Sequence, residues 1–336
     1  MKYFPGTKLK DQFMKKICLT LALAGVFVLS IAQATTIATK FSSDPSLTGW
    51  QIFGDTNLFQ WDSTNQNLAV TWDSSQPNSY FFHPLDTIYS KTNDFLIAFD
   101  LRLNDITVGT TPDRPFTFEI AVGLLNTANA TNAGFIRGFG SAPNIVEFTY
   151  FPNDTNDFGA TVSTLFISSQ TNFSGGGFTA PLEMATNTLF HVVMLYTAAN
   201  QTLHTTMTAD GAHFGPIQDA YLGGWFDDFQ VDAVSINSYS DEGQYPGFEG
   251  SILAHGVVDN FAFASPPPLG VINAVAAGKI QFSATTNWLY TLQRTTDLQT
   301  WTNVLTTTSG GTTNLVLQDT NAPSDKAFYR VTADLP

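Results

Sequence analysis

Cysteine is almost absent from this sequence. The one cysteine, Cys18, lies in an apolar N-terminal stretch, so the rest of the chain has no thiol. This excludes a disulfide framework, a thiol nucleophile and a thiolate metal site beyond that stretch. A secreted chain without disulfides depends on its core for stability, and about 300 residues can bury enough surface for that.

The first 34 residues predict a secretory signal peptide. Five lysines are followed by the apolar run ICLTLALAGVFVLSIAQA, which ends in the small-residue motif AQA. This order predicts cleavage before Thr35 and a secreted, extracellular or cell-surface protein. The alternative is a membrane anchor, but a helix from Ile17 to Ala32 spans roughly 24 Å, less than the ~30 Å hydrocarbon core. We expect no membrane insertion after cleavage, with Met14 as an alternative start.

Basic residues are also scarce. Taking the five lysines and Asp11 of the leader from 14 Lys+Arg and 28 Asp+Glu leaves 9 and 27, a net charge of −18. Nucleic acids and anionic lipids are bound by neutralising phosphates with Lys and Arg, so this charge excludes both as partners. It suits neutral glycans or divalent cations.

Helical periodicity is missing after the leader, and short alternating runs take its place. In FLIAFDLRL (95–103) the odd positions are apolar, and 116–122 and 144–151 alternate in the same way. LFHVVMLY (189–196) and TLHTTMTADG (202–211) predict a hairpin joined by a polar AANQ turn. The chain is therefore expected to be all-β.

One stretch predicts a domain boundary. SPPPLG (265–270) contains three consecutive prolines, which form a stiff extended segment and do not fit a central strand. We expect a large domain over 35–264, this linker, and a small domain over 271–336.

The large domain resembles a known superfamily in three places. FHVVMLYTAANQTLHTTMTADG is similar to the central hairpin of laminin-G-like, concanavalin A-like domains. GSILAHGVVDNFAF (250–263) resembles their closing strand, which lies beside the N-terminal strand, and KFSSDPSLTGWQIFGD resembles the opening. The resemblance implies a jelly-roll sandwich over roughly 40–264. Galactose-binding-like modules share the opening and ending but are shorter, so the concanavalin A-like version is favoured.

The C-terminal segment resembles a small module of large secreted bacterial proteins. YTLQRTTDLQTWTNV, followed by LQDTNAPSDKAFYRV, carries the pattern. The resemblance implies a fibronectin type III-like β-sandwich that serves as spacer, attachment or export module. The residues themselves predict five or six short strands and these core candidates: Trp288, Tyr290, Leu292, Trp301, Phe328 and Val331.

Catalytic motifs are missing. The chain has no G-x-S-x-G elbow, HExxH, CxxC or Walker sequence. Laminarinase-type glucanases of the superfamily carry E-x-D-x-x-E on one strand, and that motif is absent as well. His255 and Asp259 share one face of the predicted closing strand, which favours a strand-end histidine over an active site.

The superfamily resemblance implies a structural calcium site. In similar jelly rolls an aspartate of the last strand, an acidic group near the first strand and backbone carbonyls hold Ca²⁺. Asp259 and Asp44 are the matching residues here. The alternative is that both are solvated turn residues.

Several polar side chains fall on the outward faces of the predicted strands. If the strands are neighbours, these side chains converge on one concave sheet and can bind sugar hydroxyls; the alternative is an ordinary solvated face. Trp225, in LGGWFDDF, is the candidate for an exposed aromatic platform that stacks on a sugar ring, with core packing as its alternative. The other candidate carbohydrate-binding residues are Asp100, Arg102, Glu119, Glu147, His191 and His204.

The sequence thus favours a secreted, non-catalytic protein that binds a polysaccharide, a cell-surface glycan or another surface ligand. One alternative is a structural or adhesion component of the cell envelope without a saccharide site. The other is a polysaccharide-cleaving glycoside hydrolase, which requires two carboxyl groups about 5–10 Å apart in a cleft.

Overall fold

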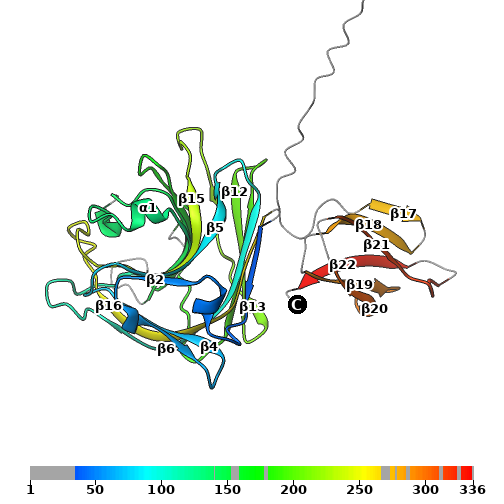
Figure 1. Cartoon of the computed structure of the whole chain (residues 1–336), viewed down its shortest axis with the longest axis horizontal. Helices are drawn as coiled ribbons and strands as arrows, with labels where there is room; N and C mark the ends of the chain where they lie inside the picture. The colour runs from blue at the N-terminus through cyan, green and yellow to red at the C-terminus, as the bar shows by residue number, and fades with distance from the viewer. Residues whose placement is uncertain are drawn as a thin grey trace, which may run out of the picture. The chain divides into compact units, whose positions relative to one another are not determined.

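The computed structural model describes nine stretches of the chain (Figure 1). The predicted signal peptide lies outside them, as does the linker after Ser265. Among the residues described, no helix is long and apolar enough to cross a membrane. The stretches are 35–139, 141–152, 159–177, 181–265, 273–276, 278–284, 288–309, 313–323 and 327–334.

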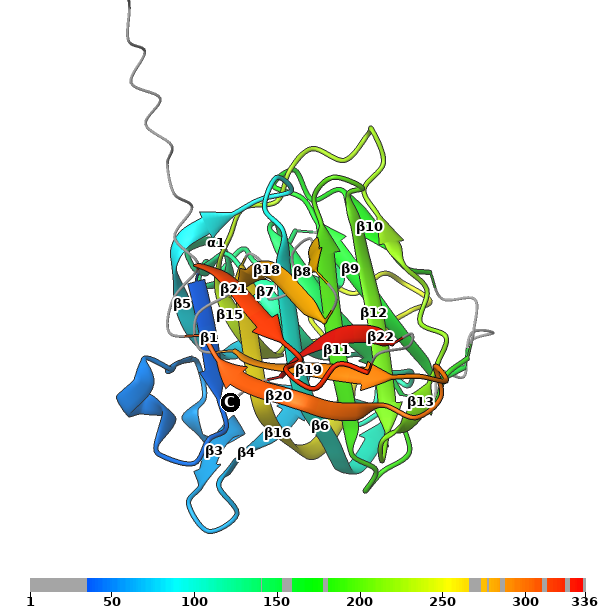
Figure 2. The same ribbon diagram turned by 90° about the vertical axis from the view of Figure 1, so that its right-hand side faces the viewer.

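Residues 35–265 form an antiparallel β-sandwich of two sheets (Figures 1 and 2), which confirms the predicted all-β fold class. The first sheet has the order β13 (Ala212–Phe214), β12 (Thr202–Ala209), β11 (Phe190–Thr197), β6 (Phe95–Val108), β16 (Ile252–Ser265), β4 (Asn67–Asp73) and β3 (Phe59–Asp62). In the same sheet β1 (Thr35–Thr39) pairs with β16, and β14 (Ala220–Tyr221) pairs with β12. The second sheet has the order β10 (Phe173–Gly175), β9 (Thr161–Ile167), β8 (Ile145–Phe151), β7 (Ile120–Leu125), β15 (Val231–Ser238), β5 (Ser79–Tyr89) and β2 (Gln51–Phe53).

Short helices lie in the connections between the strands. They are η1 (Pro45–Thr48), η2 (Thr56–Leu58), α1 (Thr127–Ala130) and η3 (Arg137–Phe139). The chain alternates between the sheets: β4 lies in the first, β5 in the second and β6 in the first again. These crossings give the jelly-roll connectivity expected from the sequence.

The core lies between the sheets and is rich in phenylalanine. The odd positions 95–103 of β6 are fully buried, as predicted. Phe99 meets Phe148 of β8 edge to face across the sandwich, with ring centroids 5.6 Å apart. Such aromatic pairs add to the area that each ring buries.

The predicted closing strand and hairpin are confirmed. β16 lies between β6 and β4, and its C-terminal half pairs with β1, the N-terminal strand. β11 and β12 pair in register from Phe190 to Thr197. Asp210 and Gly211 both have positive φ, the backbone conformation that the predicted tight turn requires.

One predicted strand begins later than expected. The alternation over 116–122 suggested a single strand, but β7 starts at Ile120. The backbone of Phe116 instead bonds the segment before β16, donating to the Glu249 carbonyl and accepting from Ser251 N–H. Residues 116–119 therefore cross from that segment to the second sheet.

The C-terminal residues form six strands in two three-stranded sheets, consistent with the predicted small sandwich. Trp288, Tyr290 and Leu292 are buried as predicted, but Phe328 is 42% exposed, so that prediction was wrong. The fibronectin type III-like assignment and the domain bounds stay predictions. The sheets are β17 (Asn273–Ala276), β18 (Lys279–Ala284) and β21 (Thr313–Gln318), and β20 (Thr302–Thr308), β19 (Leu289–Thr295) and β22 (Phe328–Asp334).

Candidate functional site

Asp100 and His191 meet on the outer face of the first sheet. They are cross-strand partners in β6 and β11, and His191 Nδ1 lies 2.7 Å from Asp100 Oδ1. Asn260 donates to the other Asp100 oxygen at 2.7 Å. The Asp100 side chain is 14% exposed and that of His191 48%. This pair forms a small, shallow polar patch.

The other candidates on the first sheet are dispersed. His204 bonds Asp219, with 2.7 Å between Nδ1 and Oδ1, at the β12–β14 edge. Arg102 is exposed and forms no ion pair with any described residue. Trp225 is 59% exposed, so its core-packing alternative was wrong. None of these side chains lines any of the four cavities found among the described residues.

The predicted convergence on one sheet was wrong. Glu119 precedes β7 and Glu147 lies in β8, both in the second sheet, whereas Asp100 and His191 belong to the first. Alternation along a strand shows which residues share a face, but it carries no information on which sheet the strand joins.

The two aspartates of the predicted calcium site have separate partners. Asp44 caps η1, accepting from Ser46 N–H at 2.9 Å. Asp259 is the cross-strand neighbour of Asp100, and its pKa is raised by partial burial and by the Asp100 charge. Within the described stretches, no group of three His, Cys, Asp or Glu side chains is placed to hold a metal ion. The contacts of Asp44 and Asp259 therefore give no support to the predicted calcium site.

His255 is a surface residue of the closing strand. Its Nδ1 lies 2.7 Å from Asp105 Oδ1 of β6, and both side chains are about half exposed. His255 therefore lies within β16, paired with Thr71 and Asp105, and not at the strand end that the sequence suggested.

A buried ionic cluster lies on the outer face of the second sheet. Glu147 and Glu119 both contact Arg137 of η3, at 2.6 and 3.0 Å. Tyr239, which follows β15, donates to Glu147 Oε2 at 2.9 Å, and the Arg137 guanidinium lies 5.8 Å from the centre of the Tyr239 ring. Both glutamates are at most 1% exposed. We call Arg137, Glu119, Glu147 and Tyr239 the Arg137 cluster.

Backbone geometry makes room for this cluster. Gly123 of β7 is the cross-strand partner of Glu147. A Cβ atom at Gly123 would lie 2.2 Å from the Val146 carbonyl oxygen and 2.6 Å from Glu147 Cα. The absence of a side chain at residue 123 therefore allows the Glu147 strand to pack this closely.

The two glutamates of the cluster are not equivalent. Burial raises the pKa of Glu119 to about 8, Arg137 opposes this rise, and Glu147 adds to it. Glu119 Oε2 accepts from Arg137, whereas Oε1 is buried without a hydrogen-bond partner. Glu147 accepts from Arg137 through Oε1 and from Tyr239 through Oε2. Burial therefore favours the protonated form of Glu119.

Glu119 also lines a cavity of about 310 Å³, which we call the Glu119 cavity. Three phenylalanines line it, as does Thr117, whose buried hydroxyl has no partner either. Its lining residues are Thr117, Phe118, Glu119, Arg137, Gly138, Phe151, Gly159, Thr161, Gln244 and Phe248.

A larger cavity of about 550 Å³ is lined by other residues of the 135–138 and 240–248 segments; we call it the Arg114 cavity. Phe53 supplies aromatic surface, Phe135 is only 3% exposed, and Asn132, Arg114 and Glu242 supply polar groups. The full lining is Phe53, Ser75, Pro77, Asn78, Arg114, Ala130–Ala133, Phe135, Ile136 and Ser240–Glu242.

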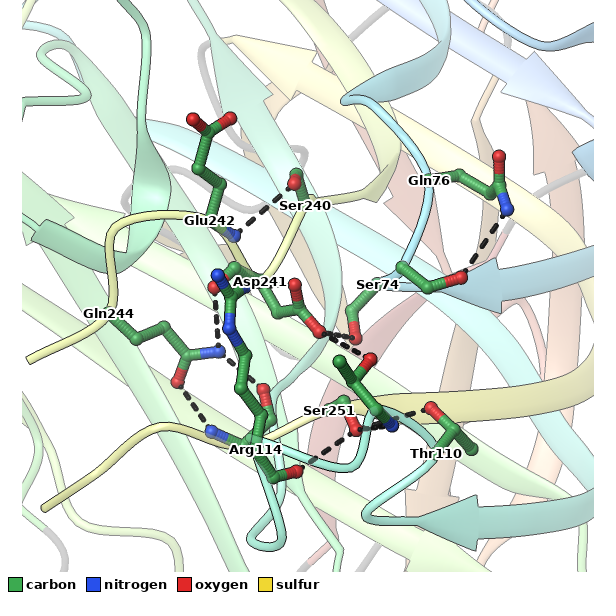
Figure 3. A network of polar contacts seen from close by, with 12 residues as sticks. Ser74, Gln76, Thr110, Arg114, Ser240, Asp241, Glu242, Gln244 and Ser251 are labelled. Carbon is green, nitrogen blue, oxygen red and sulfur yellow. Dashed lines mark hydrogen bonds and ion pairs between the residues drawn. The ribbon is translucent and has the colours of Figure 1, made fainter. Parts of the chain in front are cut away.

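A network of hydrogen bonds and an ion pair holds polar residues that line the Arg114 cavity in place (Figure 3). Asp241, whose side chain is 7% exposed, pairs with Arg114 and accepts from the hydroxyls of Ser74 and Thr111 at 3.3 Å each. Ser251 donates to the Arg114 carbonyl at 3.1 Å. Burial raises the pKa of Asp241, opposed by Arg114. The network ties together the loops after β4, after β6 and before β16.

The network leaves some polar groups of the cavity available. The Arg114 guanidinium has five N–H groups, and one nitrogen is used on Asp241. Glu242 directs its carboxylate away from Asp241 (Figure 3). Asn132 uses its oxygen to accept from Gly134 N–H at 2.8 Å, and its amide N–H groups bond no described residue.

Sequence reasoning missed Arg137, Arg114 and Asp241. All three lie outside the strands, where no alternation marks a buried side. One indication was available: with so few basic residues in an acidic chain, each arginine is a candidate for a buried pair.

Comparisons with known proteins give distant matches. No protein-family model and no curated protein matches the chain. Among solved structures, peanut lectin bound to a nonamer peptide has 16% identity over 68% of this chain and 99% of its own, with a TM-score of 0.41. A seed lectin of Lotus tetragonolobus has 10% identity over 69% and 98%, and the metal-free lectin I-B4 of Griffonia simplicifolia has 8% over 69% and 100%; both TM-scores are 0.42. The chain is thus similar to these lectins at low identity.

Proposed function

We propose that this chain is a secreted, non-catalytic bacterial protein that binds carbohydrate in the Arg114 cavity. The observation that carries the proposal is the lining of that cavity, in which the partly exposed Phe53 lies among available groups of Arg114, Asn132 and Glu242. Sugar rings have apolar faces that pack on aromatic side chains, and their hydroxyls bond planar amide, guanidinium and carboxylate groups.

The dimensions and rigidity of the cavity support this function. Ligand pockets are typically about 300–1,000 Å³ and combine apolar walls with a few convergent polar groups. The bonds of Asp241 to Arg114, Ser74 and Thr111 hold the guanidinium before a ligand arrives. Fixing polar groups in advance lowers the entropy cost of binding.

The same contacts disfavour the hydrolase alternative. A glycosidase needs two carboxyl groups that reach the scissile bond from both sides. Both Glu147 oxygens are engaged inside the Arg137 cluster, and Glu119 alone of that pair lines a described cavity. In the Arg114 cavity, Asp241 is held in its hydrogen-bond network, and the carboxylate of Glu242 points away from Asp241 (Figure 3). Neither pair is arranged as an acid and a base about one bond.

The test compares three surfaces on a panel of soluble and insoluble polysaccharides. Asn132→Ala and Glu242→Gln alter the Arg114 cavity, His191→Ala alters the first sheet, and Trp225→Ala removes the exposed indole. We expect the wild-type protein to be retained without releasing reducing sugar. Asn132→Ala and Glu242→Gln should each weaken retention about tenfold, with His191→Ala and Trp225→Ala unchanged.

Other outcomes have clear meanings. Loss of retention in Trp225→Ala or His191→Ala alone moves the site to that surface and refutes the Arg114 cavity. Release of reducing sugar refutes the non-catalytic assignment, and no retention on any polysaccharide favours the structural or adhesion role. Repeating the assay with EDTA tests the predicted calcium site. Loss of retention in EDTA would show that binding requires calcium. Recovery of the protein from the culture medium of a bacterial host tests export.

A further inference from the structure

The Arg137 cluster contains more negative than positive side chains. Glu119 and Glu147 face one guanidinium, and both carboxyl groups are fully buried. The other titratable side chains against them are Tyr239, after β15, and Tyr80 of β5, whose pKa values burial and Glu147 raise, so both stay neutral. With both glutamates ionised, the cluster would carry one uncompensated negative charge, which is costly in a buried setting.

In the protein without a ligand, a proton on Glu119 balances this charge. Burial raises the pKa of Glu119 to about 8, so the group is mostly protonated at neutral pH. Oε1 is then either the hydroxyl or the carbonyl oxygen of the protonated acid, and in both cases it has no hydrogen-bond partner. An unpartnered polar atom at such depth costs about 1–3 kcal/mol in general, and a ligand that bonds it recovers that cost.

The surroundings of Glu119 select among ligands. Phe118, Phe151 and Phe248 line the cavity together with it. Aromatic rings attract cations through the negative potential over their faces, and rings grouped with a carboxylate are a favourable setting for ammonium groups. A metal ion such as Ca²⁺ wants six to eight oxygen ligands, whereas three phenyl rings and the Arg137 side chain occupy much of this lining. A neutral polyol carries no charge, so it would leave the Glu119 proton in place and gain nothing from the negative charge of the cluster.

We propose that the Glu119 cavity binds a small organic cation, whose ammonium group lies between the Glu119 carboxylate and the phenylalanine rings. The cation takes the place of the proton, so that the positive charges balance the negative charges of the two glutamates. The volume of about 310 Å³ lies at the lower end of the usual range for ligand pockets and suits a small ligand. Glu119 Oε1 is shielded from solvent, so binding requires a lining side chain to move; Phe248, 57% exposed, is the most exposed phenylalanine of the lining.

This site is independent of the proposed carbohydrate site. The two cavities share no lining residue, although both use the 135–138 and 240–248 segments as a wall. Loss of glycan retention therefore leaves the cation proposal standing, and the reverse also holds.

The first experiment is a titration of the purified protein with choline by calorimetry, with 3,3-dimethylbutan-1-ol as the control ligand. The alcohol has the shape of choline with carbon in place of the charged nitrogen. We expect choline to bind at pH 8 and the alcohol to bind at least tenfold more weakly. Because choline displaces the Glu119 proton, its affinity should fall by up to tenfold per pH unit from pH 8 to pH 6. Ethanolamine in place of choline shows whether the site takes a primary or a quaternary ammonium.

Two variants test the residues. Glu119→Gln has almost the same shape and cannot become negative, so it should lose choline binding, whereas Asp113→Asn, at an exposed carboxylate, should keep it. Phe248→Ala removes a ring that is largely exposed, so folding is little affected, and affinity should fall about two- to thirtyfold. Equal binding of the alcohol, no choline binding at pH 8, or unchanged affinity in Glu119→Gln would each overturn the proposal.

Discussion

Glu119 should make the stability of this protein depend on pH in a way that one substitution removes. The pKa of Glu119 is about 8 in the folded protein, against 4.5 for the ordinary side chain. Between these values the folded state holds a proton that the unfolded state has lost. The free energy of unfolding therefore falls as pH rises through this window, by up to about 1.4 kcal/mol per pH unit from this group alone.

Glu119→Gln isolates this contribution. The amide replaces the protonated acid with nearly the same shape, and its oxygen can accept from Arg137 as Glu119 Oε2 does. The variant should have a shallower slope than the wild type, by about 1.4 kcal/mol per unit, or about 2–3 kcal/mol between pH 5 and pH 7. The slopes come from urea unfolding at pH 5, 6 and 7.

Other carboxyl groups titrate in the same range, so the difference between proteins is the quantity to measure. Asp113→Asn makes the same change of charge at an exposed position and should keep the wild-type slope. Parallel slopes for wild type and Glu119→Gln would refute the reasoning, because Glu119 would then titrate alike in the folded and unfolded states.

Three further predictions concern packing and the surface. Gly123→Ala places a Cβ atom 2.2 Å from a backbone oxygen and should cost about 2 kcal/mol or more in urea unfolding, whereas Gly224→Ala, with open space around it, should change stability by less than about 0.5 kcal/mol. Phe99→Ala should cost about 3–5 kcal/mol, against a much smaller loss for the exposed Ile88→Ala; equal losses would contradict the core assignment. Trp225→Ala should leave the urea midpoint within error while removing the fluorescence of an exposed indole, and a large destabilisation would show that the ring is buried.

The fold followed from local sequence patterns to a large extent. Odd positions of 95–103 are apolar, and β6 buries that face; the β11–β12 hairpin and the closing strand were likewise visible in the sequence. The exception was 116–119, where alternation continued into a segment whose backbone bonds a neighbouring loop. Periodicity reports the side-chain faces of a segment but not its hydrogen-bond partners.

The candidate site followed much less well. Glu119 and Glu147 were selected as residues on one polar face, and they do meet, but around Arg137, a loop residue that no pattern marked. Asp100 and His191 were selected because they lie on polar strand faces, and they meet on the other sheet because the register of β6 and β11 makes them cross-strand partners. Long-range contacts made by loops depend on how the chain closes over the sheet, and local sequence does not encode that closure in a readable pattern.

Retention on polysaccharides tests the central claim most directly, with wild type and Asn132→Ala compared on the same panel. The account predicts that wild type is retained on at least one glycan without release of reducing sugar, and that Asn132→Ala is retained about tenfold more weakly. Wild-type retention that is unchanged in Asn132→Ala and in Glu242→Gln would contradict the assignment of carbohydrate binding to the Arg114 cavity.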